Sequence, residues 1–200
     1  PGGGSYGATS QPIDPGSAGG TYPDRTTMGG NGGGAVRILA SGTVTVNGTI
    51  DANGATTWSQ YAAPGSGGAI WIDCATFGGN ANGLCSVRGG YAYNANVAGG
   101  GGRLALHYTS LADPHAVRCW AAPGTNSWGA ADPDHRWHYV PEMGALWLPD
   151  TALLSADTFS NRTFLDVALY LGNTNAWAAD TLSIADASVR FPQSGFQLTV

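Results

Sequence analysis

Four short stretches, Gly34-Ala-Val-Arg-Ile38, Gly68-Ala-Ile-Trp-Ile72, Gly102-Arg-Leu-Ala-Leu106 and Gly144-Ala-Leu-Trp-Leu148, repeat one pattern along the chain. The copies begin 34, 34 and 42 residues apart. Apolar residues alternate in each copy, which places every second side chain on the same face of a strand. We therefore expect one buried column of side chains: Val36, Ile38, Ile70, Ile72, Leu104, Leu106, Leu146 and Leu148.

A second apolar segment follows each of the first three copies, at residues 43–50, 84–87 and 116–119. A fixed period with one strand polarity favours coils stacked in parallel over hairpins, which need only short turns. The pattern predicts an all-β protein, a right-handed parallel β-helix (β-solenoid) with long Gly-rich loops. We expect Gly-rich coils with a period near 34 residues over 1–150, and further coils with shorter loops, truncated, over 151–200.

Glycine is abundant between the expected strands and accounts for 32 of the 200 residues. The Gly-Gly pair that precedes the early strands indicates places where backbones of neighbouring coils approach closely, with no Cβ between them. We expect the pairs Asn47-Gly48, Asn53-Gly54 and Asn82-Gly83 to supply residues of positive φ at the corners.

Charge and hydropathy exclude several classes of protein. Only 10% of residues are charged, the net charge is −5, and the basic residues are all Arg without a cluster. This argues against nucleic acid as a partner. No apolar run reaches the roughly 18 to 20 residues of a membrane span. The start reads as internal, without a signal peptide, and the strand-like end at Val200 suggests a piece of a longer protein.

The three cysteines, Cys74, Cys85 and Cys119, lack the spacing of a zinc site. Cys85 and Cys119 occupy the second segment of consecutive units, so they are expected in adjacent coils about 5 Å apart. We expect stacked thiols, and proximity leaves a disulfide open.

Several stretches resemble a known family: Gly2-Gly-Gly-Ser-Tyr-Gly7, Gln11-Pro-Ile-Asp-Pro-Gly-Ser17, Gly32-Gly-Gly-Ala-Val-Arg-Ile38 and Gly42-Thr-Val-Thr-Val-Asn-Gly-Thr-Ile-Asp-Ala-Asn-Gly54. They look like the Gly-rich β-helix segments of large bacterial secreted and surface proteins, autotransporter passengers and filamentous adhesins. The resemblance covers about residues 1–110 well and the rest loosely. It implies an extracellular or cell-surface location and carries no catalytic motif onto this chain.

The densest polar cluster, Asp132-Pro-Asp134-His135-Arg136-Trp137-His138, lies in the longest inter-strand loop. Its two carboxylates, two imidazoles and one guanidinium fit calcium binding, the binding of an acidic sugar, or the acid/base chemistry of a polysaccharide lyase or hydrolase. A solvated loop with Asx turns explains the same residues, and we favour it. We therefore expect no cofactor, with calcium as the alternative.

Aromatic residues recur at the long-loop position of successive units, where a parallel stack would align them along one edge. Such an edge either packs the loops down or offers a platform on which sugars stack. The candidate ligand-binding residues are Trp58, Tyr61, Tyr91, Tyr93, Trp128, Asp132, Asp134, Arg136, Trp137 and Tyr139. These features favour a structural or adhesive segment with extracellular polysaccharide or neighbouring copies as partners. A polysaccharide lyase or glycoside hydrolase domain and a carbohydrate-binding module are the alternatives.

Overall fold

The computed structural model describes residues 7–21, 27–59, 61–93, 97–125, 141–154, 158–160 and 163–200. The fold is all-β with parallel sheets, and the described residues contain no α-helix, only one short 3-10 turn, η1 (Ala152–Leu154). The all-β, parallel part of the expectation is therefore confirmed.

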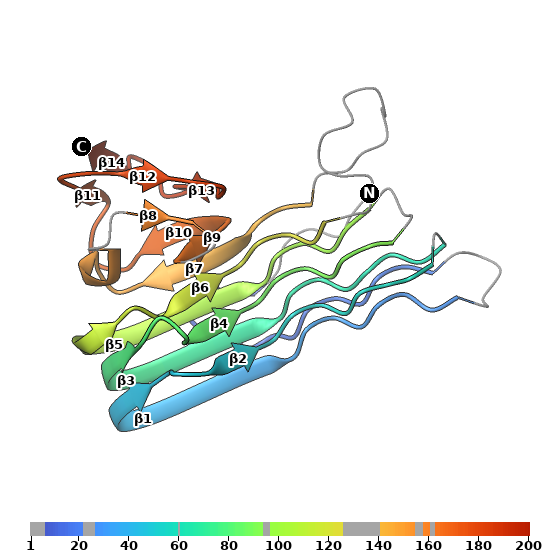
Figure 1. The fold of residues 1–200 in the computed structure, drawn as a ribbon, viewed down its shortest axis with the longest axis horizontal. Coiled ribbons are helices and arrows are strands. Elements are labelled where there is room, and N and C mark those ends of the chain that lie inside the picture. The colour runs from blue at the N-terminus through green and yellow to red at the C-terminus, as the bar shows by residue number, and fades with distance from the viewer. Residues whose placement is uncertain are drawn as a thin grey trace.

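The first seven strands of the chain alternate between two parallel sheets (Figure 1). The six-stranded sheet contains, in order, β1 (Ala35–Thr45), β3 (Ala69–Gly79), β5 (Arg103–His115), β7 (Gly144–Leu148), β10 (Val167–Leu171) and β13 (Val189–Arg190). The four-stranded sheet contains β2 (Thr49–Asp51), β4 (Leu84–Ser86), β6 (Arg118–Trp120) and β9 (Phe164–Leu165). Two small parallel sheets join β8 (Thr158–Phe159) to β12 (Ser183–Ile184) and β11 (Ala176–Ala178) to β14 (Gln197–Thr199).

The register of the larger sheet explains the repeat. Val36 pairs with Ile70, Ile70 with Leu104, and Leu104 with Leu146. The column continues beyond the fourth copy, since Leu146 pairs with Leu169 of β10. Parallel pairing therefore extends past residue 150 into the region where glycine becomes scarce.

The apolar core lies between the two main sheets. Six of the eight residues expected in the buried column are fully buried: Ile70, Ile72, Leu104, Leu106, Leu146 and Leu148. The prediction is wrong in degree for Val36 and Ile38, which are only partly buried and pack against the core. The reason is position, because β1 is the edge strand of its sheet and has a neighbour on one side only.

Extended glycine-containing segments adjoin the strands and lie side by side beyond their ends (Figure 1). Leading rows, residues 28–34, 62–68, 97–102 and 141–144, run into β1, β3, β5 and β7. Trailing rows, residues 52–57, 87–92 and 121–125, follow β2, β4 and β6. A further segment, residues 14–20, packs on the first two leading rows, with bonds such as Gly16 N to Gly33 O (2.8 Å).

Backbone hydrogen bonds from the leading rows to a given neighbour recur at every third residue, whereas the trailing rows donate to the next trailing row at intervals of two and three residues, as at Ala52, Gly54 and Thr57. Gly30 and Gly33 donate to the carbonyls of Ala63 and Ser66, each at 2.9 Å. The bonds from Gly65 to Ala55 (3.1 Å) and from Gly68 to Ala52 (2.8 Å) join a leading row to a trailing row with the same interval. Three residues is the period of a polyproline II helix, which has no internal hydrogen bonds and must satisfy its polar groups outside itself. The rows are therefore a bundle of extended chains joined through their backbones.

Close approach explains why glycine occupies the rows. A Cβ added to Gly67 would lie 1.9 Å from the carbonyl oxygen of Val87, far inside van der Waals contact. Between neighbouring units, a Cβ added to Gly68 or Gly102 would lie 1.9 or 2.2 Å from the carbonyl oxygen of Gly34 or Gly68, so the expected close approach is confirmed at these two glycines. Gly34 is the exception, because an added Cβ there meets nothing within 4 Å. The expected positive φ of the Asn-Gly pairs is wrong, because none of these residues has one. Gly54 and Gly83 are instead required by carbonyls of other segments, 2.1 Å from an added Cβ.

Candidate functional site

The loop edge is where the structure brings sequence-predicted residues together. Tyr93 donates its backbone N–H to the carbonyl of Thr57 at 2.9 Å, which ties the tips of the first two trailing rows. The rings of Trp58 and Tyr93 consequently lie 5.7 Å apart between centroids, tilted by 44°. Trp58 is 75% exposed and Tyr93 44%. Tyr61, 48% exposed, belongs to the same loop as Trp58. We call these three residues the aromatic edge.

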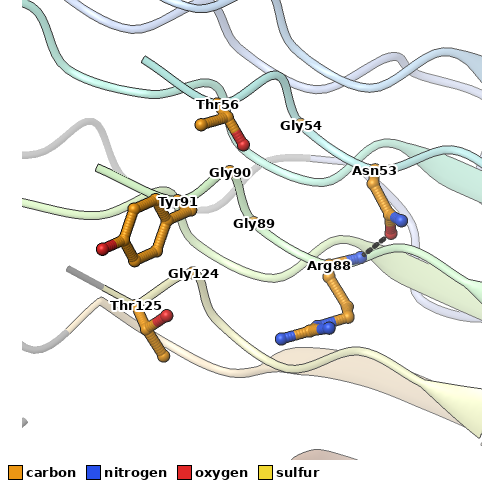
Figure 2. A pocket seen from close by; sticks show the side chains of 9 residues that line it. All are labelled: Asn53, Gly54, Thr56, Arg88, Gly89, Gly90, Tyr91, Gly124 and Thr125. Atoms are coloured by element: carbon orange, nitrogen blue, oxygen red, sulfur yellow. Dashed lines mark hydrogen bonds between the residues drawn. The ribbon is translucent and has the colours of Figure 1, made fainter. Parts of the chain in front are cut away.

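Tyr91 occupies a different place, on a shallow depression over the trailing rows (Figure 2). The depression is lined by Asn53, Gly54, Thr56, Arg88, Gly89, Gly90, Tyr91, Gly124 and Thr125. Three successive trailing rows contribute to it, and glycines form much of its lining. Figure 2 shows the Arg88 and Tyr91 side chains at two sides of this space, with Gly89, Gly90 and Gly124 between them.

Asn53 holds the backbone of the neighbouring row in place at Arg88. Its Oδ1 accepts hydrogen bonds from the Arg88 backbone N–H (2.5 Å) and the Ser86 hydroxyl (2.7 Å). Because both groups donate, the amide oxygen is fixed toward them and the Asn53 NH2 group remains as a donor. Asp51, in turn, accepts the Asn53 N–H at 2.7 Å, the geometry of an Asx turn.

The Arg88 guanidinium lies 5.7 Å from the centroid of the Trp120 ring, and Arg118 lies 5.2 Å from the same ring. The Nε of Arg88 is buried and has no hydrogen-bond partner. In the part of the chain that the structure describes, no carboxylate pairs with Arg88; the ion pair found there joins Arg190 to Glu142 at 2.6 Å. Among the described residues, the positive charge of Arg88 in the depression therefore has no acidic partner.

Arg88 was not among the residues that the sequence suggested. It is an isolated arginine before a Gly-Gly pair, and neither a cluster nor a motif distinguishes it from the other arginines. Arg88 lies in the depression because neighbouring rows align beside it. The one sequence signal for this position is its separation of three residues from Tyr91, which places both side chains on the same side of an extended segment with a three-residue period.

The remaining predicted residues, Trp128, Asp132, Asp134, Arg136, Trp137 and Tyr139, lie outside the described residues. Their proposed column, calcium binding and acid/base chemistry stay predictions. Among the residues that are described, no group of three or more His, Cys, Asp or Glu side chains has the arrangement of a metal site.

The cysteines are unsuited to nucleophilic chemistry. Cys85 and Cys119 pair in register on β4 and β6, and all three cysteines are free and buried, so the expected neighbouring thiols are confirmed. Burial raises the pKa of Cys85 to about 12 and that of Cys119 well above its usual value. The reactive thiolate is thus suppressed at neutral pH. Burial also raises the pKa of Tyr108, whose hydroxyl donates to Asp150 Oδ1 at 3.1 Å.

No protein-family model, no curated protein and no solved structure matches this chain. Within the described residues, the structure contains no helix with the length and apolar character needed to cross a membrane.

Proposed function

We propose that this chain is a right-handed parallel β-helix segment of an extracellular bacterial surface protein, serving as a rigid structural or adhesive unit that binds glycans along its loop edge. The in-register parallel sheets support the β-helix, since each unit places one strand in each sheet. The Gly-rich surface-protein sequences that the chain resembles support the location.

One observation carries the binding proposal: Trp58 and Tyr93, from successive units, lie 5.7 Å apart and are both exposed. Exposed aromatic rings that do not cover a core offer their faces to the C–H surfaces of sugar rings. Aromatic rings that recur in successive units along the stacked sheets suit a polysaccharide, because its sugar residues also repeat at a regular spacing. The strands offer little else, because their backbone groups are used between units.

The test is binding of a panel of neutral and acidic polysaccharides to the chain and to Trp58→Ala. We expect Trp58→Ala to weaken binding at least about tenfold, a loss in the range of an aromatic contact. Circular dichroism should stay unchanged, because Trp58 is mostly exposed. Ile184→Ala, an exposed apolar residue on β12, is the matched control and should bind like the parent. Absence of binding by the parent chain, or full binding by Trp58→Ala, contradicts the proposal.

A further inference from the structure

The depression beside the aromatic edge has the chemistry of a site for a negatively charged sugar. Its one cation, Arg88, has no carboxylate partner among the described residues. A guanidinium held on a concave surface without an acid is a ready partner for a ligand carboxylate, which it binds through two parallel hydrogen bonds.

The spacing of the two largest side chains is set by the row. Arg88 and Tyr91 are three residues apart, one period of the extended row, so they project to the same side. A polyproline II rise of about 3.1 Å per residue puts their backbone positions about 9 Å apart. Gly89 and Gly90 lie between them and Gly124 lies on the next row, so none of these three lining residues brings a side chain into the interval (Figure 2).

Polar groups around this interval suit a sugar. Thr56 and Thr125 bring exposed hydroxyls from the rows on either side. The Asn53 NH2 group is available as a donor because its Oδ1 is occupied by Ser86 and Arg88. A half-buried tyrosine ring, two or three hydroxyl and amide groups and one guanidinium make up a small, mixed site of the kind that fixes an orientation.

We propose that the depression binds a uronic acid residue of an acidic polysaccharide, with Arg88 holding the carboxylate and Tyr91 packing against the sugar ring. The inference rests on the proposed glycan binding and specifies its ligand. Tyr91 and Tyr93 belong to the same segment, so one extended glycan can contact the aromatic edge with some residues and the depression with another. The aromatic edge supplies affinity for the chain, and Arg88 selects for charge.

The experiment compares two oligosaccharides with the same skeleton, an oligogalacturonate and its fully methyl-esterified form, by calorimetric titration at low salt. The parent chain should bind the acidic form at least about tenfold more tightly, and this preference should shrink as salt screens the charge. Arg88→Gln should lose the preference while binding the ester as the parent does. Arg88→Lys should keep part of it, because a lysine supplies charge without the bidentate fork.

The controls separate this inference from the proposed function. Arg37→Gln removes an exposed arginine from the other sheet, where it stacks 4.3 Å from the Trp71 ring centroid, and should keep the preference. Equal binding of both oligosaccharides by the parent, still weakened by Trp58→Ala, overturns the uronate site and leaves the proposed function intact. Binding of neither oligosaccharide, nor of any other polysaccharide, overturns both. If Arg37→Gln and Arg88→Gln lose the preference for the acidic oligosaccharide equally, that preference comes from the overall charge of the protein. This outcome also overturns the uronate site.

Discussion

The strands and the glycine rows of this protein stack the same units in two different ways. Between the strands, neighbouring units meet through side chains, and residues such as Leu104 and Leu106 are fully buried. Between the rows, units meet through backbone atoms, and an added Cβ would lie about 2 Å from a neighbouring carbonyl at Gly68 or Gly102. One half is thus stabilised by burial of apolar surface and the other by hydrogen bonds at close approach.

The difference shows why the chain needs so much glycine without becoming disordered. Glycine carries a larger entropy cost of folding than other residues. In this protein the backbone N–H and C=O groups of each row form hydrogen bonds with a row of the same unit and with a row of the next unit, which offsets that cost. The rows also end in the loops that present Trp58 and Tyr93, so a rigid bundle positions the aromatic edge.

The largest expected effect comes from a side chain placed between two rows. In Gly68→Ala, the new Cβ would lie 1.9 Å from the Gly34 oxygen, which also accepts the Ala69 N–H at 3.0 Å. The backbones must separate, and we expect a loss of about 4 kcal/mol or more in the free energy of unfolding. Gly34→Ala is the matched control, because an added Cβ there meets nothing within 4 Å. In chemical denaturation, the free energy of unfolding of Gly34→Ala should lie within about 0.5 kcal/mol of that of the parent. Equal stabilities of the two variants would contradict close packing of the rows.

A smaller loss is expected from a cavity among the strands. Leu104→Ala removes a fully buried side chain from the middle of the column and should cost about 3 kcal/mol, since neighbours can relax partly into the space. Leu39→Ala, on β1 and 57% exposed, should change stability by less than about 0.5 kcal/mol. Thermal unfolding of the two variants checks the difference. A loss from Leu39→Ala as large as that from Leu104→Ala would place the core on the wrong face of the sheet.

The strands could be predicted from the sequence because alternation at a fixed period specifies both the element and the buried face. Val36 and Ile38 fit the same pattern, yet the pattern does not say which strand lies at an edge. The glycines of the Asn-Gly pairs were assigned to positive φ because composition alone cannot separate a turn from a close approach. At Gly54 and Gly83 the deciding atoms belong to segments distant in the chain.

The candidate site was predictable only where it repeats. Trp58 and Tyr93 recur with nearly the same spacing as the strands, so the period brings them to one edge. Arg88 has no repeated counterpart, and its role depends on the empty interval between it and Tyr91, which glycines of two rows create. A site formed by the absence of side chains leaves no motif in the sequence.

Hydrogen exchange of individual backbone amides tests the three-residue pattern of the rows most directly. The account predicts strong protection of Gly30, Gly33, Gly65 and Gly68, which donate to neighbouring rows at 2.8 to 3.1 Å. Their protection should approach that of Ile72 in β3, while the exposed Gly48 exchanges rapidly. Rapid exchange of the four row glycines together with a protected Ile72 would contradict the account, because the rows would then be loops attached to a β-sheet core.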